Sequence, residues 1–172
     1  MEGERVFLRI LSPDDVSDAY VAWLSDPEVT QYLECRWRSF SKEELRAYVA
    51  TMNKDEHNVL FGIFEKNAAL HLGNIKIGSI DMLHRFADIG VLIGERRCWG
   101  KGYGAEAISL ATRYAFEELN LNKVIAGIYA ANVASLKAFL KAGFKEAGVL
   151  RQHRFCKGVY MDEIIVEKCR CS

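Results

Sequence analysis

The chain has 172 residues, half of them hydrophobic, and Lys plus Arg equal Asp plus Glu at 23 each. This length suits a single domain with its own core, and the balanced charge is not that of a dedicated nucleic-acid binder. No apolar run approaches the length of a membrane span, and the N-terminus lacks the apolar core of a signal peptide. We expect a cytoplasmic protein with no nucleic-acid or membrane partner.

The first part of the chain predicts one strand and two helices. Alternating apolar residues indicate a strand over residues 5–10. A Ser-Pro start predicts a helix over 13–24, because serine caps helices well and proline fits the first helical position. Residues 28–40 are expected to be irregular and aromatic. A capping-box sequence then begins a helix over 41–52.

From residue 58 the periodicity changes to that of strands joined by short turns. Three consecutive strands are expected to form an antiparallel meander, followed by two helices that alternate with three more strands. The expected strands cover 59–65, 70–80, 86–93, 122–130, 144–155 and 159–167, and the expected helices cover 105–119 and 132–143. This order predicts an α/β (α+β) fold with a mixed, mostly antiparallel sheet of about seven strands flanked by about four helices.

The five cysteines are scattered along the chain. Cys169 and Cys171 lie near the C-terminus with no second pair and no histidines nearby, so their spacing does not predict a zinc site. We expect reduced cysteines and no metal, and the sequence gives this last pair no defined role.

Three glycines on alternate positions, Gly100, Gly102 and Gly104, lie between an apolar strand and a long helical pattern. Glycine lets the backbone approach a ligand closely, and the N-terminus of a helix attracts anions. The segment therefore predicts a phosphate-binding loop, although taken alone an ordinary glycine-rich turn explains it equally well.

Two nucleotide-binding motifs fit this loop poorly. Gly100-x-Gly102-x-x-Ala105 has the form of a dinucleotide fingerprint, but residues 94–99 separate it from the strand. The fingerprint also needs an acidic residue after the next strand, where this chain has Ala-Ala-Asn. A P-loop is excluded, because Gly-Lys-Ser/Thr is missing at the required spacing.

A second motif accompanies the glycine loop. The loop reads Trp99-x-x-Gly-x-Gly, and downstream Asn132-x-x-Ser is followed by Lys-Ala-Gly-Phe at 141–144. With the order of the elements, these motifs resemble the GCN5-related N-acetyltransferase (GNAT) superfamily, which binds acetyl-CoA and shares the fold expected above. Trp99 replaces the usual Gln or Arg of the family. This replacement resembles the branch of the ribosomal-protein N-terminal acetyltransferases and related small-molecule enzymes.

The resemblance implies that acetyl-CoA is held by the end of one strand, the glycine loop, the first turn of the following helix and the second motif. The residues implied are Leu92, Ile93, Arg97, Trp99, Gly100, Lys101, Gly102, Tyr103, Gly104, Ala105, Asn132, Ser135 and Phe139. In the family a backbone amide of the strand before the loop faces the thioester oxygen, which corresponds here to Leu92 or Ile93. Arg96, Arg97 and Lys101 are expected around the pyrophosphate.

Acetyl transfer from a thioester requires a neutral amine, stabilisation of charge on the carbonyl oxygen, and a proton for the thiolate. The resemblance implies Asp88 as the base, where family members place a catalytic carboxylate. Water-relayed deprotonation is the rival, and His71 and His84 are lesser candidates.

The acid is less defined by the sequence. Many relatives use a tyrosine where this chain has Phe139, which cannot donate a proton. Either Tyr103 or Tyr160 substitutes, or water protonates the thiolate, and we favour the absence of a dedicated acid.

The acceptor is expected to bind between the N-terminal helices, residues 28–40 and the last hairpin. Aromatic and charged residues that could contact it are Trp23, Tyr32, Glu34, Arg36, Trp37, Arg38 and Phe40. Residues 72–78 and 87–91 resemble relatives in sugar and polysaccharide biosynthesis, so a small amine, with an amino-sugar nucleotide preferred, is the first hypothesis.

Several alternatives stay open at this stage. A protein N-terminus, such as that of a ribosomal protein, is the closest alternative acceptor. A polyamine is disfavoured, because the chain has no acidic excess. A non-catalytic CoA-binding module is motivated by Phe139, and the sequence fits a monomer or a homodimer.

Overall fold

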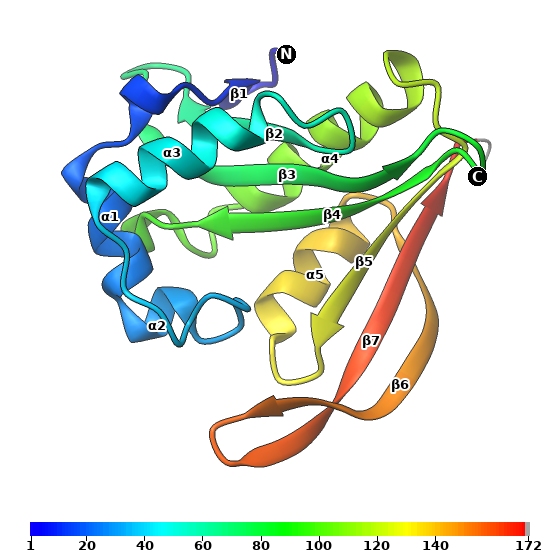
Figure 1. The fold of residues 1–172 in the computed structure, drawn as a ribbon. Helices are drawn as coiled ribbons and strands as arrows, with labels where there is room; N and C mark the ends of the chain where they lie inside the picture. The colour runs from blue at the N-terminus through cyan, green and yellow to red at the C-terminus, as the bar shows by residue number, and fades with distance from the viewer. Residues whose placement is uncertain (171–172) are drawn as a thin grey trace.

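A computed structural model describes residues 1–170 and contains one seven-stranded sheet (Figure 1). The strands are β1 (Val6–Ile10), β2 (Val59–Glu65), β3 (His71–Asp81), β4 (Phe86–Ile93), β5 (Lys123–Tyr129), β6 (Lys145–Cys156) and β7 (Val159–Cys169). They lie in the order β1-β2-β3-β4-β5-β7-β6. Every neighbouring pair is antiparallel except β4 and β5, which run parallel. The predicted fold class is therefore confirmed.

Helices cover both faces of this sheet. They are α1 (Asp18–Ser25), α2 (Pro27–Thr30), α3 (Lys42–Met52), α4 (Tyr103–Glu117) and α5 (Val133–Lys141), with 3₁₀ turns at Pro13–Asp15 and Arg96–Cys98. No helix within residues 1–170 is both long and apolar enough to cross a bilayer.

The helix predicted over 13–24 is instead a 3₁₀ turn followed by α1. Ser12 and Asp15 close a capping box around the turn, and the Asp15 carboxylate also binds Arg9 of β1 at 2.6 Å. Val16 is then extended, and Ser17 caps a new helix by accepting from the Tyr20 amide. The break is made by these local caps, which a pattern of apolar periodicity does not detect.

Two other predicted boundaries differ from the structure. The segment 28–40 is not wholly irregular, because Asp26 caps the short helix α2 with Pro27 in its first turn. The helix expected from Ala105 begins at Tyr103, because Gly102 adopts a left-handed conformation and serves as its N-cap. Both helices therefore reach closer to the cleft described below.

Gly143 ends α5 as predicted. Its φ is +87°, its amide donates to the Leu140 carbonyl, and the Phe144 amide donates to the Phe139 carbonyl. This is the double hydrogen bond of a Schellman motif, which satisfies carbonyls at the end of a helix. The motif fixes α5 against the start of β6.

The sheet separates two hydrophobic clusters. One includes Ile75, Ile77 and Ile89 of the sheet with Ile108 of α4, while the other packs α1 and α3 on the opposite face around residues such as Leu45. In Figure 1, α3 lies over β2 and β3. Each fully buried Leu or Ile contributes roughly 1.5–3 kcal/mol, so both layers hold the sheet firmly.

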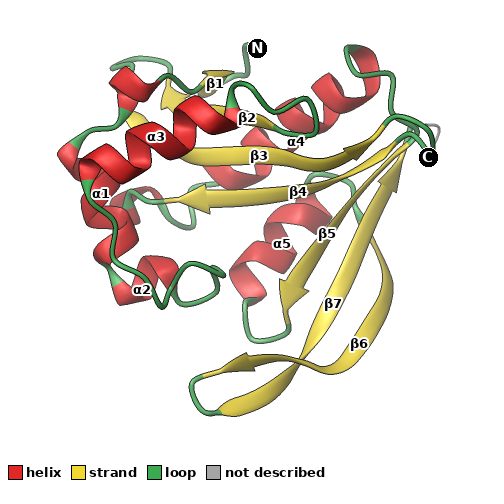
Figure 2. Ribbon diagram, viewed as in Figure 1, coloured by secondary structure: helices red, strands yellow, loops and turns green. Residues whose placement is uncertain are grey.

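The feature that positions the site is the divergence of β4 and β5. The two strands pair only at Phe86–Lys123, Ala87–Val124 and Asp88–Ile125. Beyond that point they separate toward their carboxyl ends, as Figure 2 shows. The edge of β4 that faces β5 is therefore left without a strand partner from Ile89 to Ile93.

Candidate active site

A cleft of about 1140 Å³ passes through the divergence of β4 and β5. One end, called here the glycine-loop end, is lined by residues 98–105 and residues 131–135 with several residues of α5. The other, the helical end, is lined by residues of α1 and α3, by polar residues of β3, and by Glu28, Val29, Gln31, Tyr32, Leu33 and Cys35. One continuous space therefore connects two chemically different walls.

Two of the three alternate glycines have conformations that other residues rarely adopt. Gly100 has φ +72° and Gly102 has φ +87°, whereas Gly104 is an ordinary helical residue with space for a Cβ. Gly102 is the N-cap of α4, so the amides of the first helical turn are free of intrahelical partners. Those amides and the helix dipole make this end suited to an anion.

Trp99 fastens the loop to the end of β4. Its indole Nε1 donates to the Ile93 carbonyl at 2.7 Å, and the Arg96 guanidinium lies over its ring. The residue that departs from the family pattern thus has a structural role through its N–H donor.

Arg5 forms a second tie that the sequence reasoning missed. Its guanidinium donates to the Lys101 carbonyl at 2.6 Å and pairs with Glu106 at 3.0 Å. Burial raises the pKa of Glu106, but hydrogen bonds from the Arg5 and Val6 amides and the Arg5 guanidinium outweigh it, so the pKa lies below its ordinary value. Because 96 residues separate Arg5 from Lys101 in the chain, no local pattern could have indicated this contact.

The cations at the glycine-loop end are lysines. Lys101, Lys137 and Lys141 line the cleft. The predicted Arg97 does not, because the 3₁₀ turn at Arg96–Cys98 leaves it exposed and paired with Glu95 at 3.2 Å. Of the residues predicted to contact acetyl-CoA, Arg96 and Arg97 fall outside the cleft lining, and Arg96 pairs with Asp26 and Glu28 instead.

The strand pairing of β4 shows which of its backbone N–H groups, that of Leu92 or that of Ile93, points toward β5. Gly94 donates to the Leu72 carbonyl at 2.9 Å, so its N–H faces β3. Since N–H directions alternate along a strand, the Leu92 amide also faces β3, and the Ile93 amide faces the side of β5. Between the two predicted residues, the geometry therefore favours Ile93 as a donor into the cleft.

Asp88 lies beside the cleft, outside its lining. It is the last β4 residue paired with β5, and its Oδ1 is buried without a hydrogen-bond partner within residues 1–170. Of the lesser base candidates, His71 is packed among Tyr20, Trp23 and Phe64, and His84 is exposed in the turn after β3. Neither histidine lines the cleft.

The two tyrosines considered as acids are placed differently. Tyr103 lines the cleft beneath the Arg5 guanidinium. Tyr160 is 67% exposed, packs on Phe155 of the last hairpin and does not line the cleft. Phe139 is buried against Phe144 and contributes apolar surface to the cleft wall.

The helical end is mainly apolar. Of the predicted aromatic wall, Tyr32 and Phe40 line it. Trp23 is buried in the core against Gly94, and Trp37 is 70% exposed outside the cleft with Arg36 over its ring. Other lining residues were not anticipated, and they include Tyr20, Leu24, Val29, Leu45, Tyr48, Leu60, Asn74 and Lys76.

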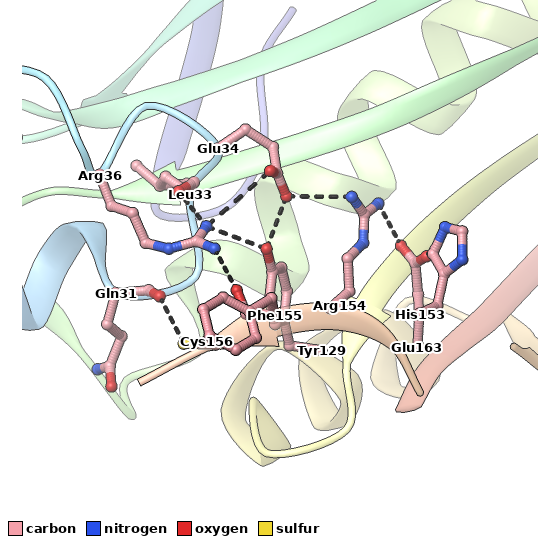
Figure 3. Close-up of polar contacts among 10 residues, drawn as sticks. All are labelled: Gln31, Leu33, Glu34, Arg36, Tyr129, His153, Arg154, Phe155, Cys156 and Glu163. Atoms are coloured by element: carbon pink, nitrogen blue, oxygen red, sulfur yellow. Dashed lines mark hydrogen bonds and ion pairs between the residues drawn. The ribbon is translucent and has the colours of Figure 1, made fainter. Parts of the chain in front are cut away.

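A polar network closes one side of this end, with Tyr129 of β5 at its centre (Figure 3). The Tyr129 hydroxyl donates to Glu34 at 2.7 Å and accepts from Arg36 at 3.0 Å. Burial and the Glu34 carboxylate raise the pKa of Tyr129, so the phenol stays protonated. The predicted charged residues Glu34 and Arg36 thus hold Tyr129, and neither they nor Arg38 line the cleft.

The same network reaches the β6–β7 hairpin. Arg154 donates to Glu34 at 3.2 Å and to buried Glu163 at 2.6 Å, and Arg36 donates to the Phe155 carbonyl at 2.7 Å. Gly127 of β5 lies directly against Glu163, and a Cβ there would overlap the carboxylate in its present position. Residues 31–36 are therefore tied to the hairpin across the helical end.

No three His, Cys, Asp or Glu side chains in the described part of the chain are arranged to hold a metal ion. The predicted absence of a metal stays a prediction. Cys171, one of the two C-terminal cysteines considered above, lies outside the described residues.

Comparison with known proteins adds independent findings. A family model described as "Acetyltransferase (GNAT) domain" matches residues 5–145. The uncharacterized N-acetyltransferase p20 of Bacillus licheniformis is 30% identical over 161 residues, which are 92% of this chain and 89% of that protein. The uncharacterized N-acetyltransferase YoaA of Bacillus subtilis is 29% identical over 164 residues, which are 94% and 92% of the two chains.

A solved structure has the same fold. Spermidine N-acetyltransferase from Vibrio cholerae, in complex with CoA and spermine, superposes with a TM-score of 0.84 and 22% identity. The match covers 97% of this chain and 96% of that one.

Proposed function

We propose that this chain, which belongs to the GNAT acetyltransferase family, transfers an acetyl group by direct attack of a small-molecule primary amine on acetyl-CoA. Family membership makes it an N-acetyltransferase with acetyl-CoA as donor. Direct attack by a small amine is supported by the continuous cleft through the β4–β5 divergence. It allows donor and acceptor to meet at the free edge of β4.

The glycine-loop end fits the donor. The first-turn amides of α4 and Lys101, Lys137 and Lys141 offer hydrogen bonds and positive charge to a pyrophosphate. The Ile93 amide would stabilise charge on the thioester oxygen. Held in one cleft, amine and thioester react without a covalent enzyme intermediate, because proximity and orientation supply much of the rate.

Deprotonation of the amine is proposed to pass through water. Asp88 lies beside the cleft, outside its lining, which favours the water route over direct abstraction by this carboxylate. For the leaving thiolate, Tyr103 is the tyrosine candidate in contact with the cleft, and solvent is the other source of a proton.

A small acceptor is favoured over a protein N-terminus. The network that joins residues 31–36 to the β6–β7 hairpin bridges the helical end, where an extended peptide would need an open groove. The acceptor end also offers little to a polycation, because Lys76 lines it and the lining carboxylate Glu28 is paired with Arg96. An amino-sugar nucleotide remains our preferred class, although relatives include spermidine acetyltransferases.

An assay of free thiol release from acetyl-CoA tests the proposal. A panel of amino sugars, amino-sugar nucleotides, amino acids, polyamines and short peptides would be compared with a reaction lacking amine. We expect turnover with a small amine. Binding of acetyl-CoA without turnover of any amine would favour a non-catalytic CoA-binding module, and turnover of peptides alone would favour the ribosomal-protein branch indicated by Trp99.

A further inference from the structure

Two polar residues of β3 form the floor of the helical end and have no role in the reaction proposed above. Asn74 and Lys76 lie on the same face of β3, because side chains alternate along a strand, and both line the cleft. Gly90 of β4 lies opposite Lys76 and has open space where a Cβ would stand. The floor thus leaves room for a ligand group beside two nitrogen donors.

Asn74 is held in a defined orientation by His71. The His71 Nε2 lies 2.9 Å from the Gly73 carbonyl and 2.9 Å from the Asn74 Oδ1. Both oxygens accept hydrogen bonds only, so Nε2 carries the proton and the amide oxygen of Asn74 faces His71. The amide nitrogen is left buried with no hydrogen-bond partner within residues 1–170, although Asn74 is only 6% exposed. A buried donor without a partner is destabilising, and a ligand oxygen would satisfy it.

Lys76 is half-buried, and no carboxylate of the described residues lies within ion-pair distance of its ammonium. Asp55 and Asp88 are the nearby acidic groups. Asp55 feels the Lys76 charge at longer range, and the Asp88 Oδ1 and the Lys76 Cε lie beside the same face of Gly78. The Lys76 side chain therefore lines the cleft without a direct ion-pair partner among the described residues.

We infer that Asn74 and Lys76 form a subsite for an anionic oxygen group, a carboxylate or a phosphate, carried by the acceptor amine, with His71 as a positioning residue. This inference rests on the proposed function, because the same amine must reach the edge of β4. Charge-assisted hydrogen bonds from an ammonium to such oxygens are stronger than neutral ones. A second cationic group on the acceptor would be repelled by Lys76.

Matched amine pairs test the subsite. Tyramine against tyrosine adds a carboxylate, and glucosamine against glucosamine 6-phosphate adds a phosphate. With the wild-type protein, we expect kcat/KM to be about tenfold or more higher for the anionic member of one pair, which corresponds to the strength of one charged hydrogen bond. The pair that shows the preference identifies the source of the anionic oxygen.

Three variants locate the effect. Lys76→Met and Asn74→Asp are expected to raise KM for the anionic amine and to bring the preference close to one, with acetyl-CoA affinity unchanged. His71→Phe removes the donor that orients Asn74 and should raise the same KM while kcat changes little. Lys54→Met, on an exposed turn residue away from the cleft, is the matched control. Melting temperatures report folding, and Lys76→Met alone decides the test if the Asn74 or the His71 variant fails to fold.

The outcomes separate this inference from the proposed function. Turnover with no anionic preference, or a preference that survives in Lys76→Met, overturns the subsite while the acetyltransferase stands. If no amine releases thiol, the proposed reaction fails. Binding of tyrosine and glucosamine 6-phosphate to the CoA-saturated protein, measured by NMR, then decides the subsite: absence of binding, or equal binding by Lys76→Met, overturns it.

Discussion

The two ends of the cleft are built by different means. At the glycine-loop end, one short stretch of chain, residues 98–105, provides backbone amides and a helix N-terminus, and residues 131–135 with side chains of α5 complete the wall. The helical end uses side chains from β3, α1, α3 and the segment 28–40, joined to the β6–β7 hairpin by contacts such as Glu34–Arg154 across 120 residues. Under the proposed function, the first arrangement would hold the constant donor largely through backbone groups, and the second would select the acceptor through side chains.

The largest expected effect is at Gly102. Gly102→Val places a β-branched residue at φ +87°, which costs about 1–3 kcal/mol of strain and adds bulk beside the anion site, so acetyl-CoA affinity should fall about a hundredfold. Isothermal calorimetry measures this. Gly104→Ala is the matched control, because its Cβ would meet only Ile93 Cγ1 at 3.6 Å, and it should bind almost normally. Equal acetyl-CoA affinities of the two variants would show that the left-handed backbone at Gly102 is not needed for acetyl-CoA binding.

The next effect concerns the network at the helical end. Tyr129→Phe removes the hydrogen bonds to Glu34 and from Arg36, each worth about 1 kcal/mol, so KM for the amine should rise roughly tenfold. Steady-state kinetics should give an unchanged KM for acetyl-CoA. Equal changes in both KM values would mean that the two ends are not independent.

Stability at the helical end should depend on pH through His71. Burial lowers the pKa of His71 below its ordinary value of 6.5, so below that pH the unfolded chain takes up a proton that the folded chain resists. The contribution of His71 to the free energy of unfolding is therefore fully present above pH 6.5. It decreases as the pH falls, by at most about 1.4 kcal/mol per pH unit. Urea unfolding at pH 7.5 and 5.5 should show a smaller loss for His71→Gln, and an identical loss would contradict this origin.

The smallest expected effect is at Asp88. A direct general base contributes about 10²–10⁴-fold in rate, whereas a carboxylate outside the cleft lining contributes far less. Asp88→Asn should therefore change kcat by less than about threefold and leave the pH–rate profile in place. A decrease in kcat of about a hundredfold, together with a shifted pH–rate profile, would instead identify Asp88 as the general base.

Features that depend on one short segment could be predicted from the sequence, whereas features that depend on contacts between separate segments could not. The order of elements, the Gly143 cap and the glycine loop depend on spacing within short segments, and the fold class they predict is confirmed. The Arg5 tie and the Tyr129 network depend on contacts between distant segments. Such contacts leave no periodicity, which is why Trp37 and Arg36 were expected in the cleft and lie outside it.

The position of Trp99 has a practical consequence. Its indole is 42% exposed at the cleft, hydrogen-bonded to β4 and adjacent to the glycines. Trp23 is buried and Trp37 lies outside the cleft. In a Trp37→Phe background, the intrinsic fluorescence that changes on addition of acetyl-CoA would come chiefly from Trp99. Under the proposed function, the side chain that departs from the family pattern would serve as an intrinsic fluorescent reporter of acetyl-CoA binding.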